Sequence, residues 1–283
     1  MLVAIAWPSV STLFKFSLAQ EHYSHMVLVP VITAFILFVE RRTIFAHVAT
    51  APRDGAALFA AAGLLRWLGG RYTASASEND QLSVTMLAIV TAWVGAFVLC
   101  YGVRAFRAGN FAVLFPLLMV PIPDALFNRV ISWILLGSAE VSYLAFDLAG
   151  VPVFRNGFVF TLPGFSIEIA RECSGIRSSM ALMIVGLLSG HVFLKSLGGK
   201  LALLLVALPV LVIKNGVRIV TLSLLAAYVD PGFLTGDLHR HGGVLFFDMA
   251  LAILGIAVRL LQSAEHSRAE PAQATSPETE QNL

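Results

Sequence analysis

Charged residues are scarce in this sequence. Asp, Glu, Lys and Arg make up 13% of its 283 residues, whereas a typical soluble domain has about 25%. Hydrophobic residues make up 58%, and the mean hydropathy is +0.82. This balance excludes an ordinary soluble domain and predicts a membrane protein that crosses the bilayer several times.

The excess of basic over acidic residues is small, and cysteines are few. The formal net charge is +2, which is too small to indicate a nucleic-acid partner. The two cysteines, Cys100 and Cys173, are too few for a disulfide framework. Cys100 lies within an apolar segment, where we expect a small buried hydrophobic side chain. Cys173 lies between a glutamate and a Ser-Gly pair, just before a long apolar segment, and this position needs another explanation.

Eight apolar segments are candidates for membrane spans, because a helix needs about 20 apolar residues to cross the hydrocarbon core. They are 2–20, 24–40, 55–69, 82–103, 110–123, 174–194, 200–229 and 242–262. We therefore expect an all-α integral membrane helical bundle of about eight transmembrane helices in a single domain, 1–262. The polar composition of 263–283 predicts a disordered cytoplasmic tail.

Basic residues gather in alternate loops between these segments, and by the positive-inside rule such loops belong in the cytoplasm. The residues concerned are Arg41, Arg42, Arg53, Arg104, Arg107, Lys195, Lys200, Arg259 and Arg268. With eight crossings, both termini lie inside, and the loops near 21–24, 71–81 and 230–240 lie outside. Residues 124–172 must then lie outside too, although they contain three arginines.

The block at about 124–172 is predicted to be a small extracytoplasmic helix/β-strand insertion before the cysteine. Its first part, 124–150, carries charged and amide side chains among apolar residues, which suits a helix along the interface or packed on the bundle. The following residues are typical of short strands broken at Asn156-Gly157 and Pro163-Gly164. Open strand edges cannot face lipid, so we expect this cap to lie outside the membrane.

Three polar residues that are far apart in the sequence are predicted to meet at the outer membrane surface. Cys173 begins the sixth span from the outside. Arg218 lies about 27 Å beyond Lys200 along the seventh span, at 1.5 Å per residue, and so near the outer boundary. His239 lies in the outer loop before the last span.

A thiol, an imidazole and a guanidinium at one level suit nucleophilic acyl transfer. The thiolate attacks a peptide carbonyl, the histidine acts as base and then as acid, and the cation stabilises the oxyanion. A helix N-terminus and Arg177, four residues after Cys173, both favour the thiolate, whereas Glu172 opposes it unless it pairs with an arginine. Asn215 lies on the same helix face as Arg218, three residues before it.

Each of these residues also has a simpler explanation. Arg177 can simply lie at the membrane–water interface, with the charged end of its side chain in water. Arg218 can form a structural salt bridge, although an ionisable group within a membrane span is a functional hypothesis by default. His239 and His241 form a His-x-His pair of the kind that binds metal, but the other ligands of such a site are not evident, so we expect neither a metal nor a cofactor.

The ordered motifs "ECSGIRSS", "NGVRIV" and "HRHGGVLFF" resemble those of the exosortase/archaeosortase family of multispanning membrane cysteine transpeptidases. The resemblance runs from "YSHMVLVP" at 23–30 to the last span. The family's nucleophile pattern matches 173–175, and its arginine pattern matches Asn215 to Arg218. His239 fits the spacing of the family's histidine better than His241, which is the alternative.

The resemblance implies that Cys173, Arg218 and His239 are catalytic, with Asn215, Arg177, Ser174, Gly175 and Glu172 in supporting roles. It further implies a protease/transpeptidase of the cytoplasmic (inner) membrane that recognises a C-terminal sorting signal on exported proteins. That signal is a short motif such as Pro-Glu-Pro, one transmembrane helix and a basic end. Cleavage outside the cytoplasm would leave an acyl-thioester on Cys173, to be released by an amine on a lipid or envelope glycan or by water.

Proteins of other classes fit the sequence less well. A transporter or channel would use Arg218 and His239 as substrate-binding charges, but it predicts polar residues through the bilayer centre, where spans two, six and eight are almost wholly apolar. A membrane assembly factor would have a structural cysteine, and replacing Cys173 by alanine tests this. A serine protease is disfavoured because Ser174 and Ser178 lack a G-x-S-x-G elbow.

Overall fold

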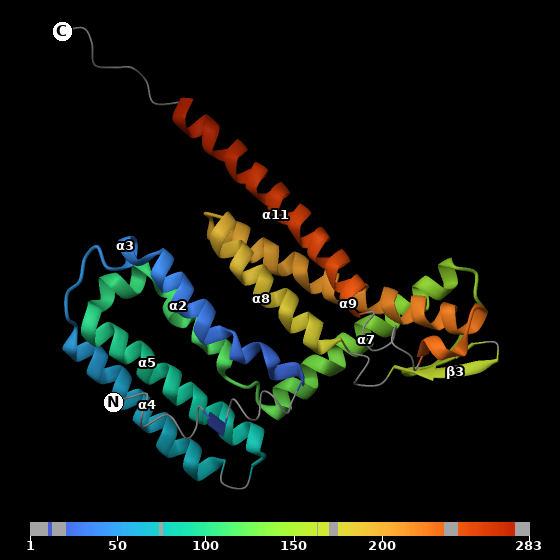
Figure 1. Ribbon diagram of the computed structural model, residues 1–283, viewed down its shortest axis with the longest axis horizontal. Coiled ribbons are helices and arrows are strands. Elements are labelled where there is room, and N and C mark those ends of the chain that lie inside the picture. Colours follow the sequence, from blue (N-terminus) through green and yellow to red (C-terminus); the bar gives the residue numbers. More distant parts are fainter. Residues whose placement is uncertain are drawn as a thin grey trace. The chain divides into compact units, whose positions relative to one another are not determined.

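The structure is a computed structural model that describes residues 11–12, 21–73, 76–162, 164–169, 175–234 and 243–274. Within these residues the protein is a helical membrane protein with one small sheet (Figure 1). The chain divides into two compact units, Met1–Arg129 and Val130–Leu283, and the predicted membrane domain includes residues of both.

The first unit is built from helices. Its elements are η1 (Glu21–Val27), α2 (Val29–Val39), α3 (Arg41–Ile44), α4 (Pro52–Tyr72), α5 (Glu78–Ala108), α6 (Asn110–Leu114), η2 (Phe115–Met119) and the first turns of α7 (Asp124–Leu148). Helices α4 and α5 lie side by side (Figure 1). They approach closely because glycines face the partner helix: a Cβ added at Gly55 would lie 2.6 Å from Leu99 Cβ.

Helix α5 is interrupted at Gly102, whose φ is +86°. The backbone N–H of Ala49 donates to the carbonyl oxygen of Tyr101 at 3.2 Å, so the loop before α4 lies directly against this kink. A Cβ at Gly102 would lie 1.7 Å from Ala49 O, which leaves room for glycine alone. Cys100, on the same helix, is exposed, so the prediction that it is buried was wrong. Lipid tails are as apolar as a protein core, and an outward-facing apolar side chain on a membrane helix therefore costs little.

A buried polar cluster fixes the proline-containing turn before α7. Tyr23 Oη donates to Asn79 Oδ1 at 3.0 Å, and Asn79 Nδ2 donates to Asp124 Oδ1 at 2.8 Å. Ser83 Oγ donates to the carbonyl oxygen of Pro121 at 2.7 Å. Burial, together with the nearby negative charge of Asp124, raises the pKa of Tyr23 from 10.0 to about 12. The bond from Ser83 satisfies a backbone carbonyl of residues 121–123, which lie outside any helix.

The second unit combines long helices with the sheet. Its elements are the rest of α7, β1 (Phe154–Asn156), β2 (Val159–Leu162), β3 (Phe165–Glu168), α8 (Ile176–Phe193), α9 (Leu197–Tyr228), η4 (Pro231–Leu234) and α11 (Gly243–Ala274). Helices α8, α9 and α11 lie side by side (Figure 1). Their shared core includes Leu182, Leu203 and Leu254, each at most 1% exposed.

Helix α7 packs on α9 through small residues. A Cβ at Gly216 would lie 2.5 Å from Val141 Cγ1, and one at Gly137 would lie 2.9 Å from a methyl group of Val212. Ser142 Oγ donates to the carbonyl oxygen of Gly216 at 3.3 Å. Close approach over small residues is a common way for membrane helices to associate. Of the two arrangements expected for 124–150, these contacts agree with packing on the bundle.

The described residues 154–168 form a three-stranded antiparallel sheet in the order β1-β2-β3. In its register Phe160 pairs with Arg155 on one side and with Ile167 on the other. Phe160 is fully buried, and a 2.9 Å ion pair between Arg155 and Glu140 joins the sheet to α7. The strands predicted on either side of Asn156-Gly157 are therefore confirmed, whereas the position of the sheet outside the membrane stays a prediction.

Five helices in the described part of the chain are long and apolar enough to cross a membrane. They are Glu78–Ala108, Asp124–Leu148, Ile176–Phe193, Leu197–Tyr228 and Gly243–Ser267. Four of them correspond to predicted spans, and the one at 124–148 was expected to belong to the cap. The prediction of a helical membrane bundle is thus confirmed, whereas the predicted count of eight spans is not. Most of the first predicted span, 2–20, lies outside the described residues.

Helix α11 continues to Ala274, beyond the point where the sequence predicts a disordered tail. Its later turns contact the connection between α8 and α9. Glu265 accepts hydrogen bonds from the backbone N–H groups of Lys195 and Ser196, both at 3.0 Å, and from the Ser196 hydroxyl. These bonds give the helix tertiary partners past residue 262.

Candidate active site at the start of helix α8

The structure describes part of the predicted site. Gly175 and Arg177 lie at the start of α8, and Asn215 and Arg218 lie on α9. Five other predicted site residues lie outside the described residues, namely Glu172, Cys173, Ser174, His239 and His241. The geometry of the site is therefore that of the turn directly after Cys173 and of the helix face against it.

Helix α8 begins at a left-handed turn. Gly175 is its N-cap residue with φ +62°, a conformation that glycine adopts without a steric penalty. The carbonyl oxygen of Gly175 accepts a hydrogen bond from the backbone N–H of Ser179 at 2.9 Å and another from Ser178 Oγ at 3.0 Å. Helix α8 thus begins at Ile176, three residues after Cys173 in the sequence.

Asn215 is the residue of α9 that contacts this turn. Its side chain is fully buried, and Nδ2 donates to Ser138 Oγ on α7 at 3.0 Å. A Cβ added at Gly175 would lie 2.8 Å from Asn215 Oδ1. The predicted supporting residues Gly175 and Asn215 are therefore brought together, and the turn has no room for a side chain.

Lys214 is a further candidate site residue, which none of the sequence motifs singled out. It is 3% exposed, and its Nζ donates to Ser178 Oγ at 2.5 Å. A lysine is almost never fully buried in a protein unless it has a partner. A charge within the otherwise apolar run "LVIKNGV" was the signal in the sequence that could have found it.

Arg218 and Arg177 differ in their surroundings. Arg218 is half-buried and lies one helical turn beyond Lys214 and Asn215, on the same face of α9. Arg177 is exposed in the first turn of α8. The start of α8 is thus held against a face of α9 that carries an amide and two positive charges.

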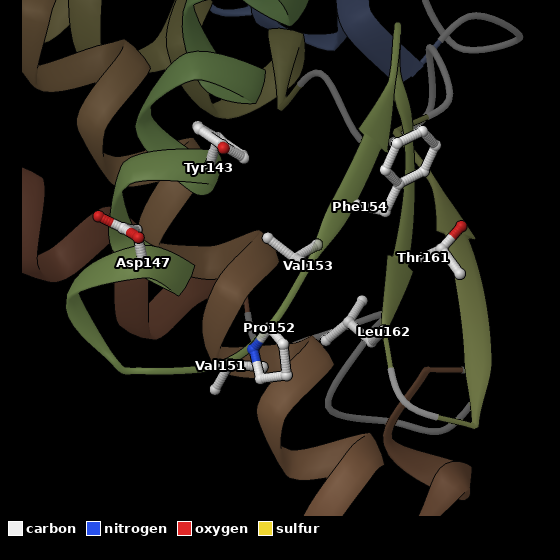
Figure 2. A pocket seen from close by; sticks show the side chains of 8 residues that line it. All are labelled: Tyr143, Asp147, Val151, Pro152, Val153, Phe154, Thr161 and Leu162. Carbon is white, nitrogen blue, oxygen red and sulfur yellow. The ribbon is translucent and has the colours of Figure 1, made fainter.

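A cavity of about 560 Å³ lies between the end of α7 and the sheet of the second unit (Figure 2). Figure 2 shows Tyr143 and Asp147 on α7, and Phe154 and Thr161 on the strands on the other side of the cavity. The rest of its wall is apolar and is made by Val151, Pro152, Val153 and Leu162. Its size is within the range of ligand pockets. Among the described residues no group of three or more His, Cys, Asp or Glu side chains is placed to hold a metal ion.

Comparison with known proteins identifies the family. The family model described as "Transmembrane exosortase (Exosortase_EpsH)" matches residues 17–256. Neither the curated proteins nor the solved structures gave a match. The matched range contains all three sequence motifs and the α8–α9 site. Because it covers most of the chain, this multi-pass membrane protein belongs to the transmembrane exosortase family.

Proposed function

We propose that the protein is a membrane cysteine protease/transpeptidase that cleaves a C-terminal sorting signal from exported proteins. The observation that carries the proposal is the contact between the turn at Gly175 and Asn215 on α9. Cys173 is separated from Gly175 by a single residue, and Arg218 follows Asn215 by one helical turn. This contact supports a thiol and a guanidinium that act on the same carbonyl group.

The first half of the reaction forms an acyl-enzyme. His239 takes the proton of the Cys173 thiol, and the sulfur attacks the scissile carbonyl carbon, whose oxygen becomes an oxyanion that Arg218 stabilises. When the intermediate collapses, the C–N bond breaks and the leaving amine takes the proton from His239. The product is an acyl-thioester on Cys173, with His241 as the alternative base.

The second half releases the acyl group. An amine on a lipid or envelope glycan, or water, gives a proton to the histidine and attacks the thioester carbonyl. The new C–N or C–O bond forms, the C–S bond breaks, and the sulfur recovers its proton. An amine makes the enzyme a transpeptidase, and water makes it a protease.

The long α9 supports a site at the outer boundary of the cytoplasmic membrane. Its 32 residues span about 48 Å at 1.5 Å per residue, whereas the hydrocarbon core is about 30 Å thick. With Lys200 at the inner boundary, Arg218 lies near the outer one and the last turns of α9 extend beyond it. A substrate anchored by its own transmembrane helix would present its cleavage site at that depth.

The sheet next to the cavity offers a place for the short motif of the signal. Strand β1 is an edge strand of the described sheet, and its first residue, Phe154, lines the cavity and is 71% exposed. An extended peptide can pair with such an edge through main-chain hydrogen bonds while side chains enter the neighbouring pocket. We propose this arrangement for the segment that precedes the substrate helix.

The nucleophile is tested with two matched variants. Cys173→Ala should abolish processing of a reporter that ends in a Pro-Glu-Pro motif, a transmembrane helix and a basic end, while Cys100→Ala should process it normally. Both proteins should accumulate in the membrane to the same level. Normal processing by Cys173→Ala would refute the cysteine mechanism.

Orientation is tested in the Cys100→Ala background, where Cys173 is the sole thiol of the chain. A membrane-impermeant thiol reagent added outside intact cells should label Cys173. Labelling that requires permeabilised cells would place the site in the cytoplasm.

A further inference from the structure

Lys214 has a position that membrane proteins rarely give to a charge. It lies within the apolar helix α9, is 3% exposed, and donates to the hydroxyl of Ser178 on α8. An ammonium group in such surroundings is costly, and charged residues in membrane spans usually serve binding or chemistry. Neither the family match nor the sequence motifs give this lysine a role.

The hydrogen bonds of Lys214 lead to the segment that carries Cys173. Ser178 Oγ accepts from Lys214 Nζ at 2.5 Å and donates to the carbonyl oxygen of Gly175 at 3.0 Å. Gly175 is in the left-handed conformation, and only Ser174 separates it from Cys173. The lysine therefore restrains the turn at Gly175, which follows the proposed nucleophile Cys173 by two residues in the chain.

A neutral side chain would make this bond to Ser178 at lower cost. Lys214 and Arg218 are four residues apart on one face of α9, and their positive charges repel each other. Asn215, the next residue, already packs against the same turn from α9. A purely structural contact therefore does not explain why a second positive charge is buried here.

We propose that Lys214 is a positioning residue of the transpeptidase reaction, which through Ser178 holds the Gly175 turn in the orientation that presents Cys173. This inference rests on the proposed function, because Cys173 must be the nucleophile for its orientation to matter in processing. It adds a residue to the site and assigns Ser178 the role of link between two helices.

The test uses the full-length Cys100→Ala protein, in which Cys173 is the sole thiol. Into it are introduced Lys214→Met, Ser178→Ala and both together, with Ser179→Ala as the matched control. Ser179 is the next residue on α8, is 2% exposed, and its hydroxyl has no hydrogen-bond partner among the described residues. Methionine keeps the length of lysine but removes its charge and its donors.

Two measurements are made on each protein. In processing of the reporter, Lys214→Met and Ser178→Ala should each lower kcat about tenfold to hundredfold with KM unchanged, since a bond to a charged group is lost. The double variant should be no slower than Lys214→Met alone, because both changes break the same chain of bonds. In alkylation of Cys173 by iodoacetamide, Lys214→Met should react more slowly, because a nearby positive charge favours the thiolate.

The outcomes separate this inference from the proposed function. If Lys214→Met slows alkylation but even the Cys100→Ala parent fails to process the reporter, the proposed function is refuted and the role of Lys214 at the Cys173 segment stands. If Lys214→Met matches Ser179→Ala in both measurements, or raises KM with kcat unchanged, the positioning role is overturned. Should Lys214→Met fail to accumulate, the processing rate of Ser178→Ala decides, because this variant breaks the same link with a smaller change while it keeps the positive charge that alkylation reports.

Discussion

Replacing Gly175 by alanine is expected to disrupt the start of α8 in two ways. At φ +62° a residue with a side chain costs about 1–2 kcal/mol more than glycine. The new Cβ would also lie 2.8 Å from Oδ1 of Asn215, which is fully buried and bonded to Ser138. Moving Asn215 away breaks that buried hydrogen bond, which costs about 1–3 kcal/mol. The free energy of unfolding should therefore fall by about 2–5 kcal/mol.

Gly157 is the matched control for this change. It has the same φ of +62° in the turn between β1 and β2, but nothing lies within 4 Å of an added Cβ. Gly157→Ala should therefore lower the free energy of unfolding by only about 1–2 kcal/mol. Both values can be measured by unfolding the purified proteins in mixed detergent micelles.

The same variant also tests the site. Gly175→Ala should lose at least about tenfold in reporter processing under conditions where it stays folded, because the displaced turn adjoins Cys173. Equal losses of unfolding free energy in the Gly175→Ala and Gly157→Ala proteins would refute the contact with Asn215. Full processing by Gly175→Ala would show that the geometry of this turn is unimportant for the reaction.

Three further outcomes are expected. Arg218→Lys should slow processing about 10²–10³-fold, because lysine keeps the charge but loses the planar pair of donors, whereas Arg177→Lys at matched protein level should cost much less; the reverse order would exchange their roles. Gly102→Ala should prevent stable folding of the first unit, since its Cβ would overlap a backbone oxygen, while Gly63→Ala, with open space around it, should be neutral in the same unfolding assay. The pKa of Tyr23, about 12 in the fold and 10.0 as the ordinary value, means that stability is retained below about pH 10 and falls as the pH rises toward 12; Tyr23→Phe should abolish this dependence.

Hydropathy and turn chemistry made part of the fold predictable. The helices at 176–193 and 197–228 were expected at 174–194 and 200–229, because the length of an apolar run is a local property that the bilayer thickness converts into a helix. The strands around Asn156-Gly157 were expected for a similar reason, since this dipeptide suits the backbone angles of a hairpin turn. Local patterns of this kind need no knowledge of the partner segments.

Exposure was not predictable from the same patterns. Cys100 was expected to be buried and is exposed, because an apolar residue on a membrane helix can face either protein or lipid. The helix at 124–148 was expected in the cap, and its length and composition also suit a membrane span. Hydropathy alone does not tell whether an apolar side chain faces protein or lipid, because both are apolar.

The sequence by itself determined the membrane class, the exosortase resemblance and the order of the motifs that carry Cys173, Arg218 and His239. Only the tertiary structure decided that Gly175 lies against Asn215 and that Lys214 is bonded to Ser178. These pairs join two helices across a connection of unrelated sequence, so no spacing rule within one helix predicts them. They depend on how α7, α8 and α9 pack. Small residues set the distance between the helices. A buried polar group must form a hydrogen bond, and that distance decides which partners it can reach.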